Sequence, residues 1–180
     1  MSGEIVIRAA VRGDEEVLSA VGKASFLEAF AGILDGGDII AHCERQHAAS
    51  VYRDWLADGD MRVWLAEAMP GRAPIGYLVL APAKLPVADP HADDLEIKRI
   101  YLLHRFHGQR VGKRLMDAAV AEARMRGAGR VLLGVYAGNA DALAFYQRCG
   151  FQRIGQRTFR VGDTDYDDII LALPLTLTAA

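Results

Sequence analysis

The sequence predicts an α/β or α+β fold built around one mixed sheet. Runs of β-branched and apolar residues alternate with segments of helical periodicity along the chain. Three of the strand-like runs follow one another in the middle of the chain, which favours a hairpin with an added strand. The 180 residues also fit one domain and show no repeat, low-complexity segment or linker. We therefore expect a single domain over residues 1–180.

The first half of the chain predicts a strand, several helices and a hairpin. Residues 4–10 (EIVIRAA) are rich in β-branched residues, which are typical of a strand. Asp14 is a plausible N-cap for a helix that reaches Phe30, because acidic residues follow it in the first turn. The elements expected next are one or two helices within 38–59 and two strands, 61–68 and 74–83.

The second half alternates strands with helices and closes on another hairpin. Residues 84–94 (KLPVADPHADD) are rich in turn formers and predict a loop. A helix over 111–127 is indicated by the apolar spacing of its residues, with Gly127 as a C-terminal stop. The other expected elements are strands at 95–103 and 130–137, a short helix at 139–150, and a hairpin of 151–161 and 165–175.

Composition excludes several classes of function. The net charge is −2, whereas proteins that bind duplex nucleic acid usually carry a strong basic excess, so no nucleic-acid partner is expected. No apolar run approaches the roughly 20 residues that cross a bilayer, and no secretory signal is recognisable. Cys43 and Cys149 are far apart in the sequence and are expected as thiols in a reducing compartment. We expect a cytoplasmic protein with no membrane association.

A glycine-containing basic turn, His107 to Met116 (HGQRVGKRLM), separates an expected strand from an expected helix. Backbone N–H groups at a helix N-terminus favour an anion, most often phosphate. The turn is not a P-loop, because its glycines are one residue too close and Arg114 stands where Ser or Thr would hold magnesium. Residues 127–134 (GAGRVLLG) precede a strand rather than follow one, which excludes a dinucleotide fingerprint. Physics alone leaves a phosphate site and an ordinary solvated loop equally open.

Two segments together resemble the GNAT superfamily of acetyl-CoA-dependent N-acetyltransferases, a resemblance that implies a mixed, mostly antiparallel central sheet flanked by helices. Residues 95–116 (LEIKRIYLLHRFHGQRVGKRLM) resemble its motif A, and residues 139–151 (NADALAFYQRCGF) resemble its motif B. The family's loop is usually written Gln/Arg-x-x-Gly-x-Gly/Ala. Here His107 stands first, Arg110 replaces the middle glycine and Gly112 keeps the last position. Further segments, among them SFLEAF and GDTDYDD, look most like the bacterial spermidine/spermine acetyltransferase branch, some of whose members are described as regulators of sporulation and protease production.

The resemblance implies how acetyl-CoA, the expected cosubstrate, is held. Backbone amides of the loop would bind its pyrophosphate, and main-chain groups of the preceding strand would pair with its pantetheine arm. Arg110, Lys113 or Arg114 could also reach phosphate, although a solvated helix face is the alternative for each. Asn139 is either a helix cap or a cofactor contact. The residues expected at the cofactor are Ile100, Tyr101, Leu102, Gly108, Gln109, Arg110, Val111, Gly112, Lys113, Asn139 and Tyr146.

The resemblance also implies two catalytic roles. Tyr146 stands where the family has its general acid, which protonates the leaving thiolate; spacing alone would make Tyr146 an aromatic core residue. Glu96 is the best candidate for the base that deprotonates the amine, directly or through a water, and the alternative is a surface carboxylate at a sheet edge. Strand alternation puts Glu96, Lys98 and Ile100 on one face, unless a bulge breaks the register.

The acceptor is expected to be a small-molecule primary amine, with a polyamine as one candidate. Phe26, Phe30 and Tyr136 are the candidate acceptor-binding residues, and a homodimer is compatible with the resemblance. Acidic residues could offer a polycation a negative mouth, although each could also be a solvated loop charge: Glu28, Asp35, Asp38, Asp163, Asp165, Asp167 and Asp168. The alternatives are acetylation of a protein lysine or N-terminus, and a regulatory module that binds coenzyme A without turnover.

No metal site is expected. Cys43 and His47 are one helical turn apart and His42 is near, but a zinc site normally uses four ligands and no second pair complements them. The interpretation favoured here is a core cysteine with surface histidines, and Cys149 is expected to serve packing rather than nucleophilic attack.

Overall fold

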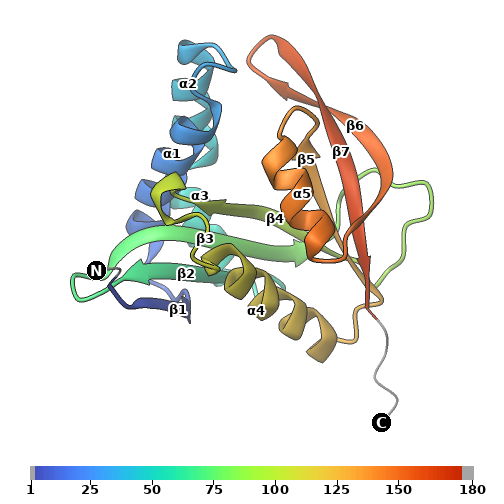
Figure 1. Ribbon diagram of the computed structural model, residues 1–180, viewed down its shortest axis with the longest axis horizontal. Helices are drawn as coiled ribbons and strands as arrows, with labels where there is room; N and C mark the ends of the chain where they lie inside the picture. The colour runs from blue at the N-terminus through green and yellow to red at the C-terminus, as the bar shows by residue number, and fades with distance from the viewer. Residues whose placement is uncertain (1–2, 176–180) are drawn as a thin grey trace. The chain divides into compact units, whose positions relative to one another are not determined.

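The computed structural model describes residues 3–175 (Figure 1). Its elements are β1 (Ile5–Ala9), α1 (Glu15–Phe30), α2 (Gly36–Gln46), α3 (Ala49–Ala57), β2 (Arg62–Ala68), β3 (Ala73–Pro82), β4 (Leu95–Leu102), the 3₁₀ turn η1 (His104–Phe106), α4 (Val111–Met125), β5 (Arg130–Tyr136), α5 (Ala140–Arg148), β6 (Gln152–Val161) and β7 (Thr164–Pro174). The order matches the sequence-based prediction, and the segment 38–59 resolves into the two helices α2 and α3.

The strands form one seven-stranded sheet in the order β1-β2-β3-β4-β5-β7-β6. Strand β4 pairs in parallel with β5, whereas β1–β2, β5–β7 and β6–β7 are antiparallel. The predicted fold class, a mixed and mostly antiparallel sheet with helices, is therefore confirmed. Contacts divide the chain into two compact units, Met1–Val79 with Arg99–Met116 and Leu80–Lys98 with Asp117–Ala180, which are described in turn.

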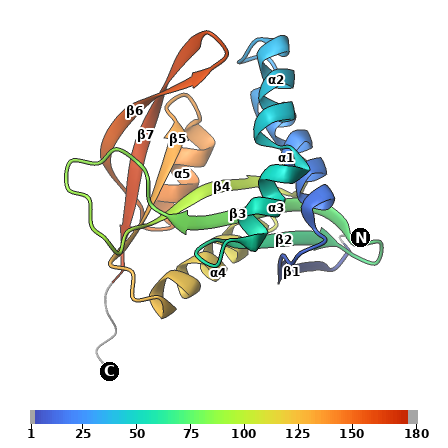
Figure 2. The ribbon, with the colours of Figure 1, turned by 180° about the vertical axis from the view of Figure 1, so that it is seen from behind.

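The first unit packs three helices together beside an antiparallel strand pair. Helix α1 buries Leu18, Val21 and Phe26, which recur at helical spacing and so form one apolar face. That helix packs against α2 and α3, and α3 also contacts β2 (Figure 2). Strands β1 and β2 pair from Ile5 opposite Ala68 to Ala9 opposite Trp64.

Asp14 stands at the N-cap position of α1, but its side chain does not cap the helix. Its carboxylate instead receives the Val11 N–H at 2.8 Å and both terminal nitrogens of Arg8, each at 2.8 Å. Arg8 also donates to Glu67 on β2, at 2.8 Å through its NH2 group. The predicted cap is thus wrong in its bonding, because the guanidinium of Arg8 attracts the carboxylate more strongly than a neutral amide does.

The second unit is built on β5, which pairs along its length with β7, and β7 pairs in turn with β6. A bulge between Arg153 and Gly155 interrupts the register of the β6–β7 hairpin. Leu132 of β5, Ile170 and Ala172 of β7, and Leu85 of the loop after β3 form a buried apolar cluster. Helix α5 ends before Gly150, whose φ of +94° suits a glycine after a helix C-terminus.

Among the described residues, no helix is both long enough and apolar enough to cross a membrane. Cys43 and Cys149 form no disulfide.

Candidate active site

The basic turn of the first unit joins the end of β4 to the start of α4 and adopts left-handed backbone conformations. Gly108 has a φ of +76° and Arg110 a φ of +61°. The α4 bonding begins where the Arg114 N–H donates to the Arg110 carbonyl at 3.0 Å. The amides just before Arg114 have no acceptor one turn earlier in the helix, since the first N–H groups of any helix lack one. The turn therefore presents successive main-chain donors at a helix N-terminus, the arrangement that binds anions.

Side chains hold this turn against its surroundings in the first unit. The His107 Nε2 lies 2.9 Å from the Leu102 carbonyl oxygen, so this nitrogen carries the proton that it donates to the end of β4. Glu28 of α1 accepts the His104 N–H at 2.7 Å. Arg114 donates to the Ile5 carbonyl of β1 at 3.1 Å, which gives this side chain a structural partner.

Strand β4 carries the residues predicted to pair with a pantetheine arm. Its parallel pairing with β5 covers Leu95–Ile97, the first three residues of the strand. Ile100, Tyr101 and Leu102 belong to the later part of β4, and all three are partly exposed.

Glu96 lies on the part of β4 that belongs to the second unit. Its side chain is buried, with 7% exposed, and its Oε2 accepts the Lys84 N–H at 2.8 Å. The alternative of a solvated carboxylate at a sheet edge is wrong, because β4 is an interior strand and Glu96 is enclosed. The register also departs from simple alternation, since Leu95 and Ile97 are buried together with Glu96.

Helix α5 of the second unit carries Asn139 and Tyr146. The Asn139 Oδ1 accepts the Ala142 N–H at 3.0 Å, so the side chain caps the helix, as one of the two predicted alternatives has it. The Tyr146 ring is buried and lies in edge contact with Phe145 and Phe151, with centroids 5.3 Å and 5.9 Å away. A phenol held in this way has a fixed ring orientation, which general acid catalysis requires.

The three predicted acceptor-binding aromatics belong to different environments. Phe26 is buried and stacks on His42 at 4.3 Å, and Phe30 is 4.6 Å from Phe26. Tyr136 belongs to the second unit, where it makes an edge contact with Tyr166 at 6.1 Å. The Phe26 and Phe30 pair is thus part of the helical region of the first unit.

A buried polar cluster in the first unit was not predicted from the sequence. The His47 Nδ1 lies 2.8 Å from the Tyr52 hydroxyl, which lies 3.0 Å from the Tyr77 hydroxyl. Arg99 of β4 donates to the same Tyr52 hydroxyl at 3.1 Å. The interpretation of His47 as a surface histidine is wrong, since it is 1% exposed. Tyr52 lies on α3, Tyr77 on β3 and Arg99 on β4, and His47 follows α2. Tyr77 and Arg99 are far from the other two residues in the sequence, so no local spacing pattern connects all four.

Most of the acidic residues considered for a cationic acceptor have local partners. Asp35 caps α2 through the Gly37 and Asp38 amides, and Asp168 pairs with Arg157 at 3.1 Å. Asp163 and Asp165 lie within 3.7 Å and 3.6 Å of Arg160. Asp35, Asp163, Asp165 and Asp168 thus have partners within the protein.

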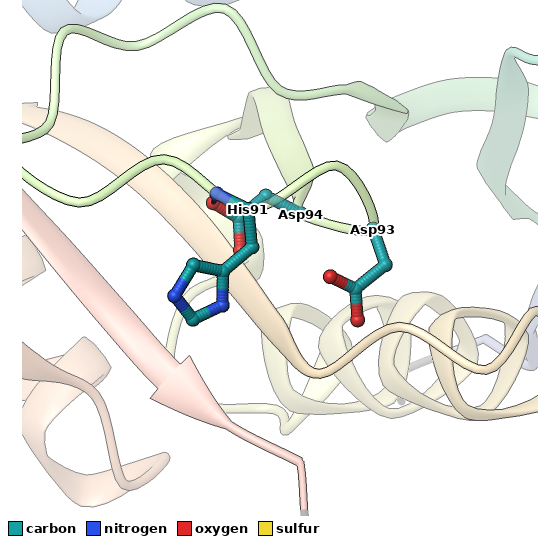
Figure 3. Close-up of side chains that lie close together, drawn as sticks. All are labelled: His91, Asp93 and Asp94. Atoms are coloured by element: carbon teal, nitrogen blue, oxygen red, sulfur yellow. Dashed lines mark hydrogen bonds between the residues drawn. The ribbon is translucent and has the colours of Figure 1, made fainter.

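His91, Asp93 and Asp94 bring potential metal ligands within 4.8 Å of one another in the loop before β4 (Figure 3). Their oxygens already have partners, however. Arg130 donates to both oxygens of Asp94, at 2.7 Å and 2.9 Å, and the Gly129 N–H donates to Asp93 at 2.8 Å. Burial alone would raise the pKa of Asp94, but the hydrogen bonds from Arg130 and from the His91 N–H, the latter at 2.9 Å, lower it overall. Asp93 and Asp94 therefore hold this loop to Gly129 and Arg130.

A family model, relatives in sequence and solved structures all point to N-acetyltransferases. Residues 27–151 match the model of the acetyltransferase (GNAT) family. An uncharacterised N-acetyltransferase of Mycobacterium bovis is 30% identical over 162 residues, which cover 90% of this chain and 98% of the relative. The crystal structure of the PaiA N-acetyltransferase of Thermoplasma acidophilum in complex with coenzyme A superposes with a TM-score of 0.73 at 20% identity, covering 96% of this chain and 99% of that one. A ribosomal-protein-alanine N-acetyltransferase of Brucella melitensis gives a TM-score of 0.71 at 22% identity, with 94% and 99% covered.

Proposed function

The chain belongs to the GNAT acetyltransferase family, and from this premise we propose that it transfers the acetyl group of acetyl-CoA to the primary amine of a small molecule. The observation that carries the cosubstrate assignment is the turn before α4, with left-handed residues at Gly108 and Arg110 and main-chain donors at a helix N-terminus. This donor set fits a pyrophosphate, because the amides and the helix dipole favour negative charge. Arg110 and Lys113 add cations at the same turn.

The reaction makes three demands on the protein after the cosubstrate is bound. The amine has a pKa of about 10.4 and arrives protonated, so a base must remove a proton. The oxygen of the thioester carbonyl gains negative charge during attack and needs a hydrogen-bond donor. The leaving sulfur, whose thiol has a pKa of about 8.5, needs a proton.

We assign these demands to residues of this chain. Glu96 acts as the base, because it combines burial with one carboxylate oxygen, Oε1, that the Lys84 amide does not occupy. A main-chain N–H of β4 between Ile100 and Leu102 is the donor to the carbonyl oxygen. Tyr146 is the acid, and its packing against Phe145 and Phe151 supports a fixed phenol. A further contact of Asn139 with the cosubstrate would have to use the Nδ2 of its amide, since Oδ1 caps α5.

A polyamine is a narrower candidate for the acceptor, and it rests on the resemblance to the spermidine/spermine branch. The ion pairs of Asp163, Asp165 and Asp168 argue against a free acidic mouth built from these residues. A protein lysine or N-terminus is the other alternative acceptor. The same proposal includes a cytoplasmic location, because the enzyme needs a supply of acetyl-CoA.

The proposal is tested with purified protein, acetyl-CoA and a panel of amines that includes polyamines, amino acids and peptides, by following release of the coenzyme A thiol. Acetylation of a small amine supports it, and acetylation of peptides alone would replace it with the protein-directed alternative. Glu96→Gln should slow the chemical step by roughly 10²–10⁴ while the affinity for coenzyme A stays near that of the wild type, whereas a merely structural Glu96 would leave this step nearly unchanged in the folded variant.

A further inference from the structure

Arg99 lies in the first unit without a carboxylate partner. Its NH1 donates to the Tyr52 hydroxyl at 3.1 Å, and its Cζ lies 4.6 Å from the centroid of the Trp55 ring. Among residues 3–175, no Asp or Glu forms an ion pair or hydrogen bond with Arg99. A guanidinium has five N–H donors, and those on Nε and NH2 have no acceptor in this part of the chain.

The polar groups around Arg99 do not supply the missing negative charge. Burial, reinforced by the positive charge of Arg99, lowers the pKa of His47 to about 2, so the imidazole is neutral. Burial raises the pKa of Tyr52 and of Tyr77, so both phenols keep their protons. His42 is also neutral near pH 7, since burial and then Arg99 lower its pKa to about 4.

The same cluster fixes where the guanidinium points. The His47 Nδ1 lies 2.8 Å from the Tyr52 hydroxyl and 3.4 Å from the Arg99 NH1, so both side chains hold the NH1 end of the guanidinium. The ring of Trp55 covers one face of the guanidinium. A Cβ on Gly22 would come within 2.3 Å of the Tyr52 hydroxyl oxygen, so a glycine in α1 allows the cluster to close.

The cluster is buried at its base and accessible at its rim. His47, Tyr52 and Tyr77 are buried, whereas Arg99, Trp55 and other aromatic members remain partly exposed. Tyr101 stacks on Tyr77 with centroids 6.0 Å apart, and it lies 6.4 Å from Phe26. A ligand that reaches Arg99 would therefore meet a cation with free donors among aromatic rings.

We propose that Arg99 binds the carboxylate of the acceptor, so that the acceptor is an amine that also carries a carboxylate, as an amino acid does. The planar fork of a guanidinium matches the two oxygens of a carboxylate, and partial burial strengthens such a pair. A polyamine would bring further positive charge to a site where no carboxylate balances the charge of Arg99. This inference rests on the proposed function, because it names the acceptor for that reaction.

The test compares acceptors that differ only in the carboxylate, phenylalanine and phenylalaninamide, with the wild type and Arg99→Gln. The acid-to-amide ratio of kcat/KM is determined for each protein, and the ratio of the two ratios cancels the different basicity of the two amines. We expect this double ratio to be about 10- to 100-fold in favour of the wild type, the range for hydrogen bonds to charged groups. Arg45→Gln is the matched control, because Arg45 is exposed on α2 and acts on His42 only through its charge. Arg45→Gln should leave the acid-to-amide ratio within about threefold of the wild-type value.

An acid-to-amide ratio in Arg99→Gln that equals the wild-type ratio would overturn the inference.

A binding measurement separates this inference from the proposed function. Calorimetric titration of N-acetylphenylalanine and of its amide into the coenzyme A complexes of the wild type and of Arg99→Gln needs no turnover. Tighter binding of the acid by the wild type that is lost in Arg99→Gln supports the assignment of Arg99 even if no amine is acetylated, which would count against the proposed function alone. Equal binding of the two overturns the assignment. A matching loss of coenzyme A affinity in Arg99→Gln would also overturn it, because Arg99 would then serve the cosubstrate.

Discussion

At the scale of single residues, Arg110 holds a backbone conformation that favours glycine. Its φ of +61° is the left-handed value, and the family pattern has a glycine at this position. A left-handed residue other than glycine costs roughly 1–2 kcal/mol. The sequence departs from the pattern here, yet the backbone at Arg110 keeps a conformation that glycine adopts readily. The departure therefore changes the strain of the turn rather than its geometry.

Arg110→Gly tests this reading of the turn. Relief of strain offsets the greater freedom of glycine in the unfolded chain, about 0.4–1 kcal/mol, so the free energy of unfolding should change by less than about 1 kcal/mol. If main-chain amides bind the pyrophosphate, affinity for coenzyme A should fall by no more than a few-fold. Gly112→Val is the comparison, since a branched side chain at the helix start should keep the phosphates away and weaken binding strongly. Equal affinities of the two variants would place the phosphates elsewhere; calorimetry measures both.

Tyr146→Phe removes one hydroxyl and keeps the ring that packs between Phe145 and Phe151. If Tyr146 donates the proton to the leaving thiolate, the chemical step should slow by roughly 10²–10⁴ while affinity for coenzyme A stays near that of the wild type. Single-turnover kinetics measures this step without interference from product release. Phe145→Leu controls for packing on the same helix. An undiminished chemical step in Tyr146→Phe would remove this residue from the mechanism and leave the proton to water.

At the scale of elements, Arg8 joins β1 to the start of α1 and to β2. It bonds Asp14 and Glu67, whose carboxylates are largely buried, and the hydrogen bonds from Arg8 lower the pKa of both. A carboxyl whose pKa is lowered by folding stabilises the fold above its unfolded pKa and loses this contribution as the pH falls through the folded value. The stabilisation is therefore complete above about pH 4.5, the ordinary pKa of glutamate.

Arg8→Met should consequently lower the free energy of unfolding most at neutral pH, and its difference from the wild type should shrink as the pH falls below about 4.5. Urea unfolding at several pH values measures this. Arg72→Met is the control: Arg72 contacts the same Glu67 at 3.3 Å, but its side chain is 59% exposed, so a small effect is expected. A difference between Arg8→Met and the wild type that is independent of pH would mean that the arginine acts through packing.

The elements themselves were predictable from local patterns, whereas several partners of their side chains were not. Apolar spacing marked α1 and α4, and β-branched runs marked the strands, because both signals arise within a few residues. The capping of α5 by Asn139 is equally local. By contrast, Asp14 bonds Arg8 rather than its helix, and the partners of His47 and Arg99 lie up to 52 residues away. No local period encodes such contacts, so the sequence could not reveal the cluster around Arg99.

At the scale of the whole molecule, the fold class and the family followed from the order of elements and from two motifs, and the model of the GNAT family matches residues 27–151. The acceptor did not follow, because acceptor recognition depends on long-range clusters that vary within a shared fold. The resemblance to polyamine acetyltransferases and the unpaired Arg99 point to acceptors of opposite charge. The net charge of the acceptor is therefore the property that distinguishes a polyamine from an amine that carries a carboxylate.

Coenzyme A should stabilise the entire chain by mass action, since a ligand that binds only the folded state adds its binding free energy to that of folding. At a hundredfold excess over the dissociation constant the gain is about 2.7 kcal/mol, which raises the melting temperature of a chain of this size by roughly 5–11 °C. ATP and NAD carry the same adenine and a pyrophosphate but no pantetheine arm. They should therefore give a smaller shift, because the contacts proposed for the pantetheine arm would be missing. Gly112→Val should lose the coenzyme A shift while its own melting temperature without ligand stays close to that of the wild type. Thermal scans at matched ligand concentrations measure all of these, and an equal shift with ATP would mean that only phosphate recognition, without the pantetheine arm, operates at this site.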